Sequence, residues 1–155
     1  MKKSILALTM VATVSVLTAC APATMNTEAA GKKYLEIVCP GNTEMDAFLT
    51  AVVGTNLELA HSAAESLKKE YESEIEQFKS VQGSWPTGVE ENINVIIAAN
   101  EAVIEAMNIV IAAQTIEEAG GNLPILDDLP AAAKAIREDL GLPEAGSADS
   151  CSIPQ

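Results

Sequence analysis

Cysteine and histidine are the residue types in this chain with the greatest potential for chemistry. The sequence has three cysteines and one histidine: Cys20, Cys39, Cys151 and His61. The cysteines lie too far apart for a C-x-x-C redox pair, and no cluster of His and Cys residues offers a zinc site. The adjacent acids Asp127 and Asp128 lack the spacing of a calcium loop, and no phosphate loop or zinc-protease motif is present. The sequence therefore predicts no catalytic or metal site, and we expect that the protein is not an enzyme.

The N-terminal residues have the pattern of an export signal. Two lysines, Lys2 and Lys3, precede an apolar run over residues 5–17, which is shorter than the ~20 residues that span a bilayer. The run ends in Leu17-Thr18-Ala19-Cys20, which resembles the lipobox of bacterial lipoproteins, a group defined by its processing. This resemblance covers residues 1–20 only. It implies cleavage between Ala19 and Cys20 and a diacylglyceryl group on the Cys20 thiol; the alternative is an ordinary secretory signal that is cut elsewhere.

The lipobox resemblance implies a location as well as a modification. We expect the mature chain on the extracytoplasmic face of the cell membrane, or on the outer membrane if the host has one. Acyl chains of the palmitate type would hold it there, because two chains together give stable anchoring. Apart from this covalent lipid, we expect no cofactor. Residues 20–38 are small, polar and aperiodic, which predicts a flexible tether ahead of a single domain over residues 39–155.

The two remaining cysteines predict a disulfide. An extracytoplasmic compartment permits disulfides, and two cysteines allow only one intrachain pairing. Cys39 precedes the first expected helix, and Cys151 lies close to the end of the chain. A Cys39–Cys151 bridge would therefore staple the two ends of the domain.

Apolar residues recur at helical spacing through most of the domain. The pattern predicts one long helix over residues 43–82, after a break at Pro40-Gly41-Asn42, and a second over residues 89–119. A third, shorter helix is expected over residues 129–140, with Asp127 or Asp128 as its N-cap. The expected fold is all-α: a long antiparallel helical hairpin with a short third helix, similar to a three-helix bundle.

Several polar or aromatic residues within these helices are candidates for a binding role. Trp85 lies at the expected hairpin tip, where it either covers the helix ends or contacts a partner. Asn100 and Gln114 fall on an otherwise apolar stripe, where a buried amide can set helix register. His61 and Met107 fall at similar heights in the hairpin and could in principle ligate haem. His61 lies off the core stripe, however, so we expect a solvated residue there.

The charge of the mature chain limits its partners. Without Lys2 and Lys3, seven basic residues face 22 acidic ones, which repels nucleic acid and anionic lipid headgroups. A membrane span over residues 95–113 is disfavoured because Glu101 and Glu105 lie in its middle. We therefore expect a lipid-anchored helical interaction or structural module that binds a helical partner or its own copy. The alternative is a binder of a small apolar ligand, such as a lipid or haem, between helices.

Overall fold

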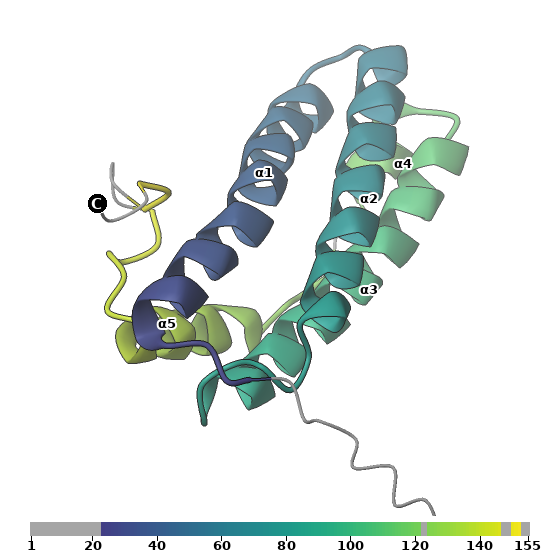
Figure 1. Ribbon diagram of the computed structural model, residues 1–155. Coiled ribbons are helices and arrows are strands. Elements are labelled where there is room, and N and C mark those ends of the chain that lie inside the picture. The colour runs from purple at the N-terminus through teal and green to yellow at the C-terminus, as the bar shows by residue number, and fades with distance from the viewer. Residues whose placement is uncertain (1–22, 122–123, 147–149, 153–155) are drawn as a thin grey trace, which may run out of the picture.

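The computed structural model describes residues 23–121, 124–146 and 150–152, which form a bundle of α-helices without strands in those ranges (Figure 1). Three long helices run up, down and up: α1 (Thr27–Val53), α2 (Leu57–Ser80) and α3 (Val89–Ala112). The short α4 (Ile116–Gly120) contacts all three at the end that holds the α1–α2 turn, here called the distal end. At the opposite, proximal end, α5 (Leu129–Asp139) packs across α3. The all-α class and the helical-bundle architecture are confirmed.

The first helix begins earlier than expected. Asn26 caps α1 by accepting the Ala29 N–H at 2.8 Å, and the helix continues through Pro40 and Gly41 to Val53. Its first turns bury side chains such as Tyr34, Ile37 and Val38. A flexible tether over residues 20–38, a domain boundary at residue 39 and a break at Pro40 are therefore wrong for the described residues 27–41. Residues 1–22, including Ala19 and Cys20, lie outside the described residues.

The expected helix over residues 43–82 is in fact two antiparallel helices. Gly54 ends α1 with an extended backbone, and Asn56 caps α2 by accepting the Leu59 N–H at 3.1 Å. An amphipathic stripe continues across this turn, because both helices bury one face in the same bundle. The second expected helix ends at Ala112 instead of residue 119, and α4 follows it. The third lies where it was expected, although Asp128 at its N-cap makes no side-chain capping bond.

Apolar side chains form two clusters along the bundle. The proximal cluster includes Leu35, Phe78 and Ile136, and the distal cluster includes Phe48 and Met107. Each of the long helices contributes to both clusters. The level between the clusters, which we call the waist, carries the buried polar residues described below.

Helix α3 is long and apolar enough to cross a membrane by length and composition. Core helices of globular bundles pass the same test. Here α3 packs against α2 and α5, and residues such as Ile93, Val103 and Met107 are buried in the two clusters. We interpret α3 as the central helix of the bundle.

The predicted disulfide is confirmed, with Cys39 and Cys151 joined across 112 residues of sequence and a Cα–Cα distance of 5.8 Å. It ties the C-terminal segment to the middle of α1. Because the closed loop is long, its loss should greatly increase the entropy of the unfolded chain.

We predict that replacing both cysteines, Cys39→Ser with Cys151→Ser, destabilises the domain by up to ~5 kcal/mol in the chain-entropy description. Urea unfolding followed by circular dichroism measures the change, with Ser152→Ala in the same exposed tail as the control. An unchanged midpoint in the double variant would show that the bridge does not constrain the unfolded chain.

Candidate functional site

The Trp85 side chain is buried inside the bundle and is not exposed on its surface. Its side chain is only 4% exposed, and its ring lies 6.1 Å from that of Phe78 within the proximal cluster. Its Nε1 has no hydrogen-bond partner among the described residues. This burial argues against a partner contact at Trp85 and agrees with the alternative that the ring covers the helix ends.

His61 and Met107 have separate environments. His61 Nε2 lies 3.2 Å from the Ala113 carbonyl oxygen, so that the ring joins the start of α2 to the end of α3. Met107 is fully buried in the distal cluster. Gln114, expected on the apolar stripe, is instead exposed beyond the end of α3, whereas Asn100 is buried as expected.

The most unusual feature of the interior is a buried carboxyl group at the waist. Glu74 lies on α2 between Tyr71 and Phe78, on the buried face, and is only 3% exposed. Burial raises the pKa of Glu74 to about 7; the Asn100 side chain opposes this rise and Glu70 adds to it. Glu74 takes part in none of the ion pairs found between described residues. Its negative charge is thus costly in this position and is easily lost to protonation.

A buried arginine reaches the same level from α5. Arg137 Nη1 donates to the carbonyl oxygens of Pro143 at 2.8 Å and Ser150 at 2.9 Å. These bonds hold the tail that follows α5, which the Cys151 disulfide also ties to α1. The guanidinium carbon lies 5.8 Å from the centre of the Tyr34 ring, within the range of a cation–π contact. Arg137 Nε, in contrast, is buried without a partner.

Two tyrosines complete the polar waist, which we define as Tyr34, Tyr71, Glu74, Asn100 and Arg137. Burial raises the pKa of Tyr34 to about 12, although the Arg137 charge opposes the rise. Burial and the charge of Glu74 raise the pKa of Tyr71 well above its usual range. Both hydroxyls therefore stay neutral at physiological pH and serve as hydrogen-bonding groups.

The polar waist surrounds a cavity of about 120 Å³. All five of its residues line this cavity, together with apolar side chains such as Val38, Ile96 and Leu129. The exposed residues Asn42 and Ala145 form part of the lining, so the cavity reaches the surface between α1 and the C-terminal tail. The four helices α1, α2, α3 and α5 thus place hydrogen-bonding groups around one small space.

Gly41 explains how α1 comes so close to this site. A Cβ atom at position 41 would lie 2.7 Å from Glu74 Oε2 and 2.8 Å from Tyr71 Cε1. Both distances are too short for a methyl group, so glycine is required unless the two buried side chains move. Gly41, which predicted a helix break, is in fact a helical residue, and its lack of a side chain permits this close packing.

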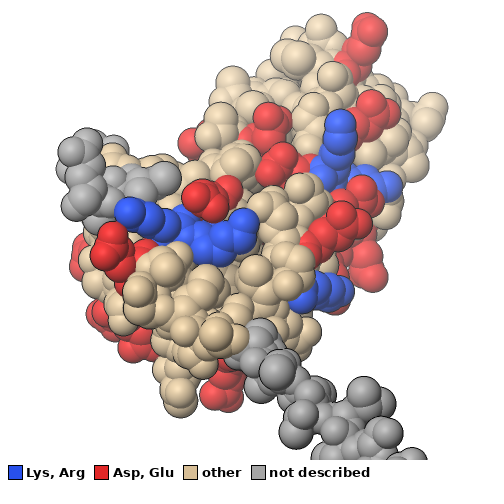
Figure 2. Space-filling view, in the orientation of Figure 1, with Lys and Arg blue, Asp and Glu red and all other residues tan. Residues whose placement is uncertain are grey.

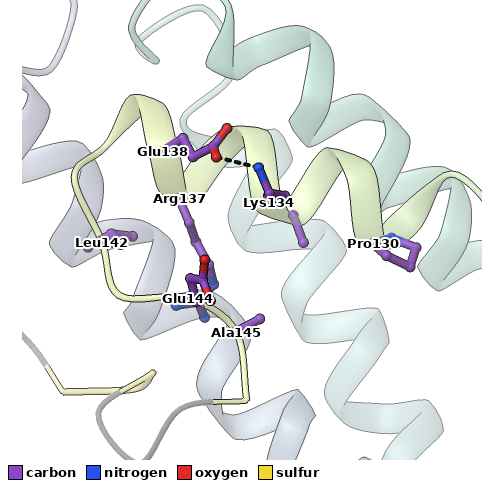
Figure 3. Close-up of a pocket in the computed structure, with 8 residues that line it drawn as sticks. Pro130, Lys134, Arg137, Glu138, Leu142, Glu144 and Ala145 are labelled. Atoms are coloured by element: carbon purple, nitrogen blue, oxygen red, sulfur yellow. Dashed lines mark hydrogen bonds and ion pairs between the residues drawn. The ribbon is translucent and has the colours of Figure 1, made fainter.

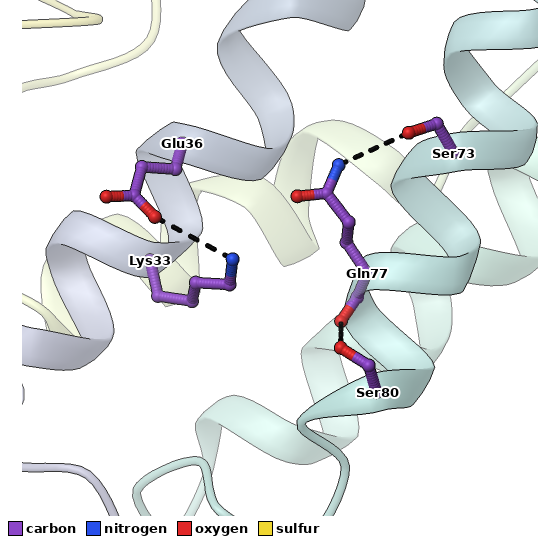
Figure 4. A network of polar contacts seen from close by, with 5 residues as sticks. All are labelled: Lys33, Glu36, Ser73, Gln77 and Ser80. Carbon is purple, nitrogen blue, oxygen red and sulfur yellow. Dashed lines mark hydrogen bonds and ion pairs between the residues drawn. The ribbon is translucent and has the colours of Figure 1, made fainter.

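A second hollow of about 290 Å³ lies on the outer side of α5 (Figure 3). Lys134 is bonded to Glu138 one turn along the helix, and both are exposed. The polar contacts on the neighbouring parts of α1 and α2 also stay within one helix each (Figure 4). Lys33 pairs with Glu36 on α1, and the Gln77 side chain donates a hydrogen bond to Ser73 on α2. These contacts join residues of one helix to each other, as on any solvated helix face, and they favour no ligand.

Large apolar side chains are exposed around the distal end. Val53 is 86% exposed and Leu59 is 56% exposed, on either side of the α1–α2 turn, with Leu49 one turn before Val53. Ile109 is exposed near the end of α3. In Figure 2 this end is largely uncharged on the visible face, with acidic side chains at its margin. We call Leu49, Val53, Leu59 and Ile109 the distal apolar end.

No known protein family, curated protein or solved structure matches the chain. Its function therefore has to be inferred from the site itself.

Sequence analysis identified Asn100 as a buried amide but missed Glu74, Arg137 and the two tyrosines. A signal for Glu74 was present, because it lies three residues after Tyr71 and four before Phe78, on the apolar stripe of α2. Arg137 lies next to Ile136, on the margin of the α5 stripe. Their approach to one cavity depends on how the helices pack, and the part of α1 that lines the cavity was expected to be a tether and a break rather than a helix.

We predict that Glu74→Gln changes how stability depends on pH. The pKa of Glu74 is raised in the folded state, so its contribution favours folding at low pH and is lost as pH rises from about 4.5 to about 7. At pH 8 the glutamine variant should be more stable than the natural chain by up to about 3 kcal/mol, and at pH 4.5 the two should be nearly equal. Urea unfolding at several pH values measures this difference.

Glu76→Gln is the matched control, because Glu76 is exposed on the same helix. Its stability should follow that of the natural chain at every pH. Equal pH dependence for Glu74→Gln and the natural chain would contradict a raised pKa at Glu74.

Proposed function

We propose that the mature chain is a lipid-anchored protein of the bacterial cell envelope, with a diacylglyceryl group on Cys20, whose helical domain binds a protein partner through the distal apolar end. The export signal and the lipobox resemblance support the anchor. The Cys39–Cys151 disulfide supports an oxidising compartment, where such bridges persist. The observation that carries the binding role is the exposure of Val53, Leu59 and their apolar neighbours at one end of the bundle.

The start of α1 gives this proposal an orientation. The Met25 N–H donates to the Ser84 carbonyl oxygen at 2.7 Å, so the chain contacts the proximal end five residues after Cys20. Five residues span at most ~18 Å. A lipid on Cys20 would therefore hold the proximal end close to the membrane surface. The 27 residues of α1 extend ~40 Å, which directs the distal apolar end away from the bilayer.

Charge indicates the kind of partner. Asp46 precedes Leu49 by one turn on α1, and Glu58 adjoins Leu59 on α2; both acids are exposed. A partner with an apolar patch and a basic rim would complement this arrangement. A second copy of this chain would bring like charges together, because the mature protein has a large negative net charge. A helix in a basic partner is therefore favoured over self-association.

The alternative of a small apolar ligand between the helices has less support. The cavity at the waist is lined by Glu74, Asn100 and Arg137, and such groups remain hydrogen-bonded only to a polar occupant. An interior ligand of this fold is therefore expected to be polar.

The anchor is tested on residue 20. We expect the natural chain to incorporate an alkyne analogue of palmitate and to fractionate with membranes, because Cys20 is the acceptor of the lipid. Cys20→Ala should abolish both. Mass analysis of the natural chain that shows an unmodified cysteine at position 20 would exclude the anchor, whatever the domain binds.

The partner surface is tested by photo-crosslinking in living cells. A benzoylphenylalanine introduced at Val53 should yield a discrete adduct with another protein, because Val53 is the most exposed of the four residues in the distal apolar end. Glu36, exposed in the proximal half of the same helix, is the control position and should yield no such adduct.

Two further measurements establish specificity. Leu59→Asp should remove the Val53 adduct without unfolding the domain, because Leu59 is exposed. Salt should reduce the yield in isolated membranes, as expected for a basic rim. An adduct with only a second copy of the chain, or equal labelling from both positions, would refute a dedicated partner surface at the distal end.

A further inference from the structure

The polar waist has hydrogen-bonding capacity that the protein itself does not use. Asn100 Nδ2 and Arg137 Nε are both buried, and neither forms a hydrogen bond of normal geometry to a described residue, although the Asn100 side chain lies near enough to Glu74 to favour its ionised form. Asn100 and Arg137 are each only 4% exposed. Buried donors of this kind are costly, and most native structures satisfy them with protein groups, water or a ligand. Here both residues line the same cavity.

A carboxyl group lines that cavity as well. Glu74 accompanies Asn100 at the cavity wall and belongs to no ion pair between described residues. The cavity thus presents two kinds of group: the Asn100 and Arg137 donors, which lack a hydrogen bond of normal geometry, and the Glu74 acid, which has no ion-pair partner among the described residues. An anion would pair with the donors but not with Glu74, and a cation would pair with Glu74 but leave the donors without an acceptor.

The cavity has the size of a small metabolite. Its volume of about 120 Å³ would hold about four waters, or one organic molecule of about six non-hydrogen atoms by comparison with apolar cavities that bind benzene. The exposed Asn42 and Ala145 in its lining provide a route from solvent.

We propose that the polar waist binds a small zwitterion of the α-amino acid type. Its carboxylate would accept hydrogen bonds from Arg137 Nε and Asn100 Nδ2, and its ammonium group would donate to Glu74. The Tyr34 and Tyr71 hydroxyls would complete the polar lining, and their rings favour a cation nearby. This site is independent of the lipid anchor and of the distal apolar end.

Related ligands fit the same groups less well. A simple carboxylate such as acetate would satisfy the donors but place a second negative charge beside Glu74. A simple amine such as ethylamine would pair with Glu74 but leave both donors without an acceptor and add positive charge near Arg137. A zwitterion makes both sets of contacts without changing the net charge of the buried site.

Binding should depend on pH through Glu74, since the ammonium group requires an ionised acid. The other charged or titratable groups around it are Glu70 and Tyr71 on α2, Tyr34 on α1 and Arg137 on α5. The raised pKa values of the tyrosines keep both hydroxyls neutral over the physiological range. With a Glu74 pKa of about 7 in the empty site, affinity should fall about tenfold between pH 8 and pH 6.

The test is a titration of the mature protein, purified from membranes in detergent, with glycine and L-alanine as probes. NMR would follow the Asn100 side-chain amide and the Arg137 Nε–H. Both resonances should shift and saturate at probe concentrations up to about 10 mM, which detects dissociation constants in the millimolar range. Acetate and ethylamine should bind at least about tenfold more weakly, the loss that corresponds to one unpaired charge contact.

Substitutions distinguish this site from nonspecific binding. Glu74→Gln should remove both the preference for a zwitterion over acetate and the pH dependence, while circular dichroism confirms that the variant is folded. Glu76→Gln should bind as the natural chain does. If neither glycine nor L-alanine shifts the two resonances, or if Glu74→Gln binds them unchanged, the proposal is overturned.

Discussion

The structure depends on accommodating charge at the level where its two apolar clusters meet. Glu74 and Arg137 are both almost fully buried, and the transfer of such groups out of water costs several kcal/mol each unless they gain hydrogen bonds or neutralise. For Glu74 the cost is reduced because its raised pKa allows the buried carboxyl group to be protonated and neutral. For Arg137 part of the cost is offset by the hydrogen bonds that Nη1 donates to two carbonyl oxygens. A bundle selected for stability alone would place apolar side chains here. The waist is therefore the part of the interior where a role other than folding is most strongly indicated.

The C-terminal tail belongs to the same arrangement. Arg137 Nη1 bonds the carbonyls of Pro143 and Ser150, and the next residue, Cys151, is bonded to Cys39 on α1. The disulfide thus restrains the tail at the position where it supplies acceptors to the buried guanidinium. Asn42 and Ala145, which line the outer part of the cavity, also line a surface hollow together with Cys39 and Cys151, so the bridge lies beside the entrance.

Much of this architecture could be predicted from the sequence, and the errors arise where tertiary packing of the helices overrides local sequence signals. The helical class, α5 and the disulfide were predictable because periodicity and cysteine number are local or nearly unambiguous signals. The start of α1 was missed because Pro40 and Gly41 resemble a break, although Tyr34, Ile37 and Val38 already follow a helical repeat. Tertiary packing decides otherwise: only glycine allows α1 to approach Tyr71 and Glu74. The grouping of Glu74, Asn100 and Arg137 depends on how three helices pack together, and the periodicity of each helix in the sequence does not reveal this packing.

The early start of α1 also changes the mechanics of a membrane-anchored protein. A tether of nineteen residues would let the domain reorient freely, so that no surface would have a preferred direction. With the chain held to Ser84 from Met25 onward, only a short segment separates Cys20 from the bundle. Under the proposed lipidation, the acidic domain would be repelled by anionic headgroups yet remain within ~18 Å of them. Because the anchor is at one end of a bundle ~40 Å long, the distal end could lie much farther from the membrane than the proximal end. The distal apolar end would then be open to a partner, whereas the cavity at the waist opens to the side of the bundle, between α1 and the C-terminal tail.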